Sequence, residues 1–246
     1  MLTAIFSDIH ANRQAFEACL AAARGKGAQR VVLLGDYVGY GADPEWAVDK
    51  VRELVAQGAI ALIGNHDRAV SHHDSHMNLE AQVAIEWTRG ELGIEQRHFL
   101  NQLPFEHRDN DALFVHADAS APQDWNYVLD ATGAAQSMHA TRAHVTFCGH
   151  VHRPAVYTLS SVGKVTTFVP VTDVPISLLR GRQWLVVVGS VGQPRDGISA
   201  ASYLIHDDER GEVTFCRAAY DVAAASAAIR ARGLPHWLAD RLTIGR

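Results

Sequence analysis

Hydrophobic and polar positions in the first third of the chain alternate between short apolar runs and amphipathic segments. The apolar runs predict strands at residues 2–6, 31–34 and 59–63. Helical spacing between them predicts a helix over 11–24 and another that begins at Asp43-Pro44, because Asp caps helices and Pro suits their first position. This strand–helix–strand–helix–strand order predicts a parallel sheet with right-handed crossovers.

The middle of the chain changes to helical spacing. Leu79, Val83 and Trp87 recur at intervals of four residues, which predicts a helix, and a second helix is predicted around 94–103 before Pro104. We expect these two helices to form an insert, around residues 78–103, beside the functional site.

Short strands separated by polar turns are predicted for much of the remaining chain. Residues 105–108 and 112–115 are typical of a hairpin, a helical patch follows near 132–143, and 145–148 is a further strand. Strands are then predicted at 155–159, 164–169, 176–180, 184–188, 201–206 and 212–217. The turns between these last strands favour hairpins and therefore predict a second, antiparallel sheet. An Ala-rich helix capped by Asp221 and stopped at Gly233 is expected near the end.

The composition is that of a globular protein, and we expect one domain spanning residues 1–246. Hydrophobic residues make up 48% of the chain, enough for a sizeable core, and no linker, repeat or low-complexity tract divides it. The net charge of −5 argues against stable nucleic-acid binding, which needs a basic surface. Three widely spaced cysteines form neither a disulfide framework nor a zinc motif. Without a signal-like start or a membrane-spanning apolar segment, a cytoplasmic location is expected.

Polar loops directly follow five of the predicted strands. The run Val31–Leu34 ends at Gly35-Asp36, and the carboxyl ends of strands are where open α/β sheets place ligands. The five loops are Asp8-Ile9-His10, Gly35-Asp36, Gly64-Asn65-His66-Asp67, His116 and Gly149-His150-Val151-His152. One such loop alone is usually a turn or a helix cap. All five together, each at a strand end, indicate a shared site.

The order D-x-H, G-D, G-N-H-D, H, G-H-x-H over residues 5–152 resembles the calcineurin-like metallophosphoesterase superfamily. The segment Gly189–Asp196 is similar to small bacterial-type phosphodiesterases of that superfamily, so the resemblance spans nearly the whole chain. The fold it implies is α/β (α+β), a four-layer sandwich of two mixed β-sheets flanked by helices.

The resemblance implies a pair of divalent metal ions that share the carboxylate of Asp36. It assigns Asp8, His10, Asp36 and His152 to one ion, and Asp36, Asn65, His116 and His150 to the other. Carboxylate, amide oxygen and imidazole ligands without thiolate suit such ions. Mn²⁺ is the expected metal, with Fe, Zn, Ni or Co as alternatives.

The implied activity is hydrolysis of phosphate esters, phosphodiesters foremost, by attack of a metal-bound hydroxide on a small phosphorylated substrate. In this pattern His66 assists the leaving group. Asp67 either takes part by holding the His66 ring or caps the following helix, and both roles stay open. Arg195, in a Gly-rich loop, is expected to contact the substrate.

Three other functions remain as alternatives on the same residues. They are a dinucleoside polyphosphate hydrolase, a phosphoprotein phosphatase and a non-catalytic scaffold. The phosphatases of the superfamily carry Asp-Arg where this chain has Gly39-Tyr40, which weakens that reading. The small phosphodiesterases have Asn-Pro where this chain has Val187-Val188, which leaves the shape of the 189–196 loop open.

Overall fold

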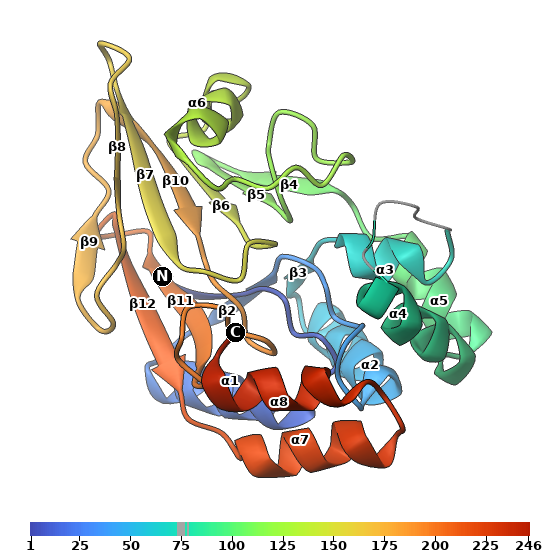
Figure 1. Cartoon of the computed structure of the whole chain (residues 1–246). Coiled ribbons are helices and arrows are strands. Elements are labelled where there is room, and N and C mark those ends of the chain that lie inside the picture. Colours follow the sequence, from blue (N-terminus) through green and yellow to red (C-terminus); the bar gives the residue numbers. More distant parts are fainter. Residues whose placement is uncertain (73–76, 78) are drawn as a thin grey trace.

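Two mixed six-stranded sheets lie at the centre of the computed structural model, which describes residues 1–72, 77 and 79–246 (Figure 1). In spatial order, the first sheet contains Ile60–Ala61 (β3), Arg30–Leu33 (β2), Leu2–Phe6 (β1), Ala201–Asp207 (β11), Glu212–Ala218 (β12) and Pro175–Ser177 (β9). The second contains Glu106–Asp109 (β4), Ala112–Val115 (β5), Val145–Cys148 (β6), Arg182–Val187 (β10), Ala155–Ser160 (β7) and Val165–Phe168 (β8).

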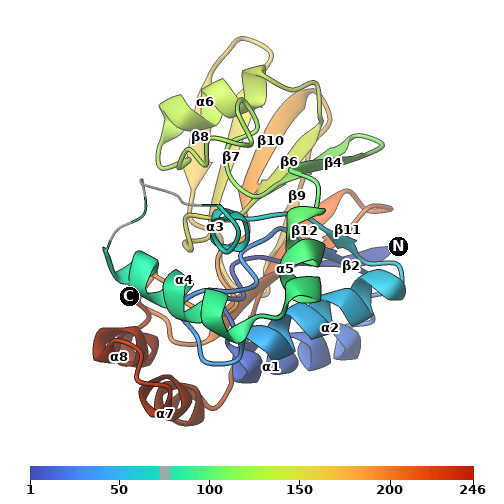
Figure 2. The same ribbon diagram turned by 90° about the vertical axis from the view of Figure 1, so that its right-hand side faces the viewer.

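Helices cover the outer faces of both sheets (Figures 1 and 2). The helices of the described residues are Arg13–Gly25 (α1), Pro44–Ala56 (α2), Asn65–Ala69 (α3), Leu79–Glu91 (α4), Ile94–Asn101 (α5), Ala131–His139 (α6), Val222–Ala231 (α7) and His236–Ile244 (α8). None of these helices has the length and apolar composition needed to cross a membrane. The four-layer sandwich implied by the resemblance is confirmed.

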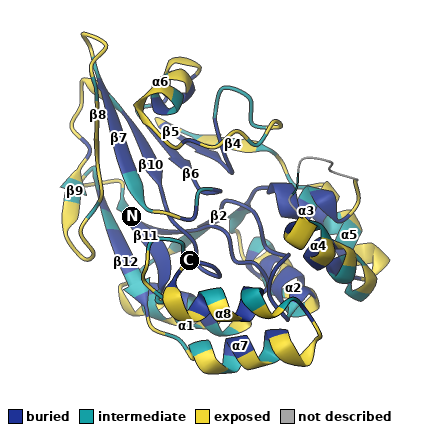
Figure 3. Cartoon of the chain, viewed as in Figure 1, coloured by how far each residue is buried: buried dark blue, intermediate teal, exposed yellow. Residues whose placement is uncertain are grey.

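Three apolar layers hold the sandwich together. Leu34, Phe147 and Leu204 belong to the buried layer between the two sheets. Phe16 of α1 belongs to the layer on the other face of the first sheet, and Met138 of α6 to that on the outer face of the second. Figure 3 shows buried residues along the central strands and exposed ones on the outer sides of the helices. Both sheets are therefore covered, which leaves their ends as the places where loops can build a site.

The strands β1, β2 and β3 are parallel, as their sequence pattern predicts. The prediction of a separate antiparallel sheet after residue 155 is wrong. Strand β10 pairs parallel with β6 and antiparallel with β7, whereas β11 pairs antiparallel with β1 of the first sheet. Strands β11 and β12 thereby bury Leu204 and Phe215 between the two sheets. Apolar burial, which local turn signals do not report, decides which sheet each strand joins.

The two helices predicted for the insert are present as α4 and α5, although residue 78, where the insert was expected to begin, lies outside the described residues. Of the three residues whose spacing predicted α4, only Trp87 packs, partly buried, against the neighbouring helices. Leu79 and Val83 are 77% and 52% exposed, while Ala81 and Ala84 are buried in a cluster with α7 and α8. Small alanine side chains let this face approach its neighbours closely, so packing selects it.

The helix α2 begins at Pro44, as predicted, but the side chain of Asp43 makes no capping hydrogen bond. Asp221 does cap α7, because its carboxylate accepts a hydrogen bond of 2.8 Å from the backbone N–H of Ala224.

The loop between β10 and β11 passes very close to the loop after β1, and this contact yields a stability prediction. A Cβ on Gly192 would lie 1.9 Å from the backbone carbonyl oxygen of Ile9. We expect Gly192→Ala to lower the free energy of unfolding by about 2–3 kcal/mol, because backbone cannot move aside cheaply. The melting temperature should fall by roughly 5–10 °C, measured by calorimetry.

Gly90→Ala is the matched control, since a Cβ there meets nothing within 4 Å. It lies in α4, where Ala favours the helix, so this variant should keep or slightly raise the stability. Equal melting temperatures for Gly192→Ala and the wild type would show that the two loops are not packed as described.

Candidate metal centre

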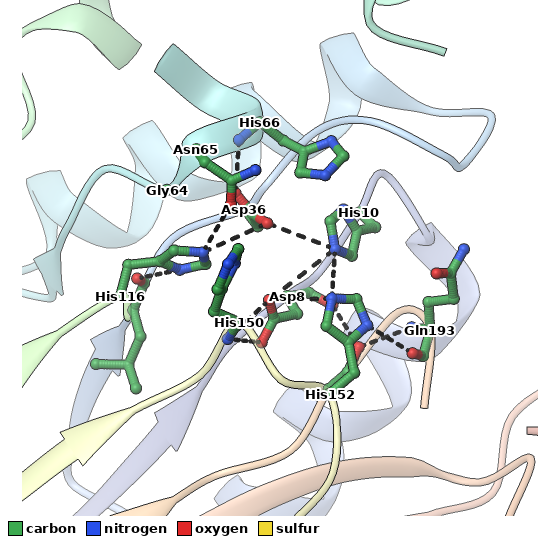
Figure 4. A network of polar contacts seen from close by, with 12 residues as sticks. Asp8, His10, Asp36, Gly64, Asn65, His66, His116, His150, His152 and Gln193 are labelled. Atoms are coloured by element: carbon green, nitrogen blue, oxygen red, sulfur yellow. Dashed lines mark hydrogen bonds and ion pairs between the residues drawn. The ribbon is translucent and has the colours of Figure 1, made fainter. Parts of the chain in front are cut away.

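Loops that follow β1, β2, β3, β5 and β6 meet at one end of the two sheets (Figure 4). They carry all seven predicted ligands, and every one of these side chains is buried. Asp8, His10 and Asp36 come from the first sheet, as does Asn65 at the start of α3. His116, His150 and His152 come from the second sheet, so the site forms only when the sheets pack together.

The ligand atoms form two groups, within each of which all atoms lie within 4.8 Å of one another. The first group is Asp8, His10, Asp36 and His152, and the second is Asp36, His116 and His150. Asn65 joins the second, since its Oδ1 lies 3.2 Å from Nε2 of His116. This grouping is the one that the family resemblance implies, with Asp36 common to both.

The Oδ2 atom of Asp36 faces both groups. It lies 3.7 Å from Nε2 of His10 and 3.4 Å from Nε2 of His116. This oxygen is buried and accepts no hydrogen bond from the described residues. The other oxygen, Oδ1, accepts a hydrogen bond of 2.9 Å from the backbone N–H of His66. One oxygen therefore fixes the carboxylate while the other is directed to the space between the two groups.

Backbone carbonyls orient three of the four histidines (Figure 4). The Nδ1 atom of His10 lies 3.0 Å from the carbonyl oxygen of Val38, and that of His116 lies 3.0 Å from the carbonyl oxygen of Leu34. The Nδ1 atom of His152 lies 2.7 Å from the carbonyl oxygen of Gln193. A carbonyl can only accept, so each Nδ1 donates and each Nε2 of a neutral ring keeps its lone pair. Metal-binding histidines are commonly held in this way.

The Nε2 atoms of His10 and His152 lie 3.2 Å apart. Because both Nδ1 atoms donate to carbonyls, both lone pairs converge where a cation would be coordinated. The buried Nε2 of His150 likewise has no hydrogen-bond partner among the described residues. Carboxylate and imidazole donors with uncommitted atoms fit divalent cations, and the residues present therefore suit a metal centre.

Burial and charge set the protonation of these groups. Burial lowers the pKa of His10 and of His152 well below its ordinary value, and lowers that of His150 to about 3. Burial opposes the charged ring of His116 most strongly, but the charge and hydrogen bond of Asp36, together with the charges of Asp8 and Asp67, outweigh burial and raise that pKa to about 9. Burial and then Asp36 raise the pKa of Asp8 to about 7, even though the charge of His116 opposes them. The buried carboxylates thus favour positive charge between them.

Five of the seven predicted ligands have left-handed backbone conformations. Their φ angles are 55° for Asp8, 47° for His10, 57° for Asp36, 64° for His150 and 61° for His152. Residues other than Gly rarely adopt such angles, and backbone strain of this kind is found mainly at functional sites. Sharp turns let two ligands from one short loop face the same point. Asp and His are among the non-glycine residues that adopt this conformation more often, but the preference is too weak to predict it from the sequence.

Asp67 fastens the loop that carries Asp36. Its Oδ2 accepts hydrogen bonds of 2.8 Å from the N–H of Asp36 and 2.9 Å from that of Gly64. Its Oδ1 accepts hydrogen bonds of 2.8 Å and 3.3 Å from the N–H groups of Tyr37 and Val38. Of the two roles left open by the sequence, these contacts support capping of α3, extended to the neighbouring loop. Asp67 is therefore a positioning residue here, and the prediction that it is catalytic gains no support from these contacts.

His66 lies beside the ligands on α3 and is 5% exposed. Its ring centroid is 4.8 Å from that of His10 and 4.6 Å from that of Tyr40. Gly39 makes this position possible, because a Cβ there would lie 2.4 Å from Nδ1 of His66. The sequence did not point to Tyr40 as a neighbour of both histidines.

Two aromatic side chains from the loop between β5 and α6 line the other side of the site. The ring of Tyr127 stacks on His150 with centroids 4.0 Å apart, and that of Trp125 meets His116 edge-on at 5.7 Å. Tyr127 is 53% exposed, so it faces solvent at the mouth of the site. Sequence reasoning missed Tyr127, which no motif marks.

The 189–196 loop reaches the centre despite Val187-Val188 before it. The N–H of Gly192 and the Oγ of Ser190 donate hydrogen bonds of 2.8 Å and 2.9 Å to the carbonyl oxygen of Asp8. Arg195 donates from its backbone N–H to the carbonyl of His152 at 3.1 Å. Its guanidinium carbon lies 5.8 Å from the ring centroid of Tyr40, which places this predicted substrate contact beside the ligands.

Comparison with known proteins gives consistent results. The family described as the calcineurin-like phosphoesterase superfamily domain matches residues 1–211. An uncharacterized protein of Methanocaldococcus jannaschii, MJ0912, is 34% identical over 252 residues, covering 100% of this chain and 98% of that protein.

Two solved structures extend the similarity to three dimensions. The crystal structure of a metallophosphoesterase from Sphaerobacter thermophilus has a TM-score of 0.88 and 35% identity, with full coverage of both chains. The hypothetical protein PH1004 from Pyrococcus horikoshii OT3 has a TM-score of 0.79, 19% identity and coverage of 100% and 98%. At that identity, the second similarity supports the fold alone.

The contacts of Asp67 yield the second prediction. Asp67→Ala leaves four buried or partly buried N–H donors without their acceptor, so we expect the free energy of unfolding to fall by at least about 3 kcal/mol. Asp130→Ala is the control, because Asp130 caps the exposed start of α6 with two N–H donors and costs about 1 kcal/mol. Urea denaturation measures both. A loss for Asp67→Ala no larger than that for Asp130→Ala would refute this role.

Proposed function

Because the chain belongs to the calcineurin-like phosphoesterase superfamily, we propose that it hydrolyses small phosphodiesters with two divalent metal ions. The observation that carries this proposal is the pair of buried His/Asp groups that share Asp36. A non-catalytic scaffold would not need two complete sets of converging donors.

The chain's own residues would hold the two ions in the groups described above. When bound, such ions lower the pKa of water and stabilise charge on a phosphoryl oxygen. Two divalent ions against the carboxylates of Asp8 and Asp36 leave a local charge of roughly +2. A phosphate ester would be attracted there although the whole chain carries a net charge of −5. We propose Mn²⁺ as the metal, with Fe, Zn, Ni or Co as the ions to compare.

We assign His66 the role of proton donor to the leaving oxygen. Its ring lies against those of His10 and Tyr40, beside the ligands and outside both metal-binding groups. Its backbone N–H is bonded to Asp36, which ties its position to the shared carboxylate. A side chain placed beside the reacting group in this way can protonate an alkoxide or phenoxide as it departs.

The neighbour of His66 favours diesters over monoesters. Tyr40 lies where the protein phosphatases of the superfamily carry Arg, and burial raises the pKa of its phenol. A neutral ring at this position cannot form an ion pair with the second negative charge of a phosphomonoester. It suits the single negative charge of a phosphodiester better.

The third prediction concerns His66. We expect His66→Ala to lower kcat for bis(p-nitrophenyl) phosphate in Mn²⁺ by roughly 10²–10⁴-fold, the usual contribution of general acid catalysis. Its metal content, measured by mass spectrometry, should equal that of the wild type. His98→Ala, at an exposed position of α5, is the control and should keep full activity. Wild-type kcat in His66→Ala would remove this residue from the mechanism.

The fourth prediction concerns the shared carboxylate. Asp36→Asn keeps the size of the side chain but removes its charge, so we expect the bound metal to fall from two ions to one or none, with loss of hydrolysis. Asp49→Asn, at an exposed position of α2, should retain both ions. Full metal content and activity in Asp36→Asn would overturn the proposal. A wild type that holds metal but cleaves neither diesters, dinucleoside polyphosphates nor phosphoproteins would support the scaffold alternative.

A further inference from the structure

A hollow that is rich in arginine lies beside the metal centre. It has a volume of about 730 Å³ and is lined by Arg153, Arg195, Asp196, Gly197, Arg241 and Arg246. Four of these six residues are arginines, in a chain whose net charge is −5. Such a concentration of one charge on an acidic protein indicates a binding surface for an anion.

The acidic residue of the hollow does not cancel this charge. Asp196 forms an ion pair with Arg217, which lies outside the lining. Arg241 donates from Nε to a main-chain oxygen of Arg246, and two other lining arginines donate to neutral oxygens. Arg153 donates from Nε to the carbonyl of Arg195 at 2.8 Å, and Arg195 donates from Nη2 to Oε1 of Gln193 at 2.9 Å. The buried Nε of Arg195 has no hydrogen-bond partner in the described part of the chain.

Arg195 connects the hollow to the metal centre. Its backbone N–H is bonded to His152, its guanidinium lies over Tyr40, and Arg153 directly follows His152 in the chain. The end of α8 closes the other side, because the N–H of Gly197 donates to the carbonyl of Gly245 at 2.8 Å. Figure 1 shows the carboxyl end of α8 next to the loop that leads to β11. The two sites therefore share a wall.

Arg241 adds a charge that water hydrates incompletely. It is on α8, where its guanidinium stacks 4.7 Å from the ring centroid of Trp237. Burial, followed by the charge of Arg195, lowers the pKa of Arg241 to about 10, so it stays charged at neutral pH. Partly buried guanidinium groups bind phosphate oxygens strongly, because they give up little hydration and donate two hydrogen bonds at once.

We propose that this hollow, the arginine pocket, binds a second phosphate of the substrate, joined by an anhydride to the phosphorus that is attacked. The inference rests on the proposed two-metal hydrolysis and extends it from simple phosphodiesters to substrates with a polyphosphate chain, in which the attacked phosphorus carries a further phosphate. The scissile phosphate lies at the metal centre and the next phosphates extend past Arg195 toward Arg153 and Arg241. The choice of substrate then depends on the attraction between the arginines and the phosphates of the polyphosphate chain, rather than on the leaving group alone.

The kinetic test compares two substrates in each variant. We expect Arg241→Gln to lower kcat/KM for diadenosine tetraphosphate about tenfold more than kcat/KM for bis(p-nitrophenyl) phosphate, which has one phosphorus. Arg153→Gln, at an exposed position where substitution should not disturb folding, should also lower kcat/KM more for diadenosine tetraphosphate than for bis(p-nitrophenyl) phosphate. Arg210→Gln, at an exposed turn away from the pocket, is the control and should leave the ratio unchanged. Equal losses for the two substrates in both variants would overturn the proposal.

A binding experiment separates failure of this inference from failure of the proposed function. Isothermal titration of metal-free protein with inorganic triphosphate needs no turnover. We expect the wild type and Arg210→Gln to bind alike, Arg241→Gln and Arg153→Gln about tenfold more weakly, and added salt to weaken all of them. The same affinity in all four proteins, or no binding, would refute the arginine pocket even if diesters are hydrolysed. Wild type that binds triphosphate but hydrolyses nothing would refute the function and retain the pocket.

Discussion

The site depends on the buried carboxylate of Asp36, in which a hydrogen bond fixes one oxygen while the other accepts none from the described residues. Asp36 accepts a hydrogen bond through Oδ1, while its Oδ2 lies within 4 Å of imidazole nitrogens from both ligand groups. An ionised group in this position is costly unless positive charge compensates it. The second carboxylate, Asp8, is also fully buried. The two buried carboxylates therefore lack sufficient positive charge nearby, and a pair of divalent cations would supply it.

Backbone contacts keep this arrangement in place. Asp67 binds the N–H groups of the Asp36 loop, and the carbonyls of Leu34, Val38 and Gln193 orient the rings of three histidines. Because these anchors belong to sheet ends and short loops, little conformational freedom remains to be lost when ligands bind. The left-handed backbone of five ligands is tolerated because so many neighbouring contacts determine it. The rigidity of the site thus results from many individually weak hydrogen bonds to backbone groups rather than from one strong interaction.

Charge is distributed unevenly over the molecule. The chain as a whole is acidic, yet four arginines line the hollow beside the metal centre. Arg195 takes part in both regions, since its backbone supports His152 and its side chain lies over Tyr40. An anionic substrate would be repelled by much of the surface and attracted at this end of the sandwich.

The sequence by itself determined the elements, the family and the identity of the residues that converge. Short apolar runs marked the strands, and polar loops at their ends marked the site, because both signals are local along the chain. Only the tertiary structure decided that β11 joins β1 in the first sheet, that Ala81 and not Leu79 is on the buried side of α4, and that Asp67 binds backbone. Each of these depends on which distant segments meet. Tyr127 against His150 and Arg241 beside Arg195 arise in the same way, so no spacing rule could place them. Local propensity reports what a segment prefers alone, whereas burial and charge pairing are settled between segments far apart in the chain.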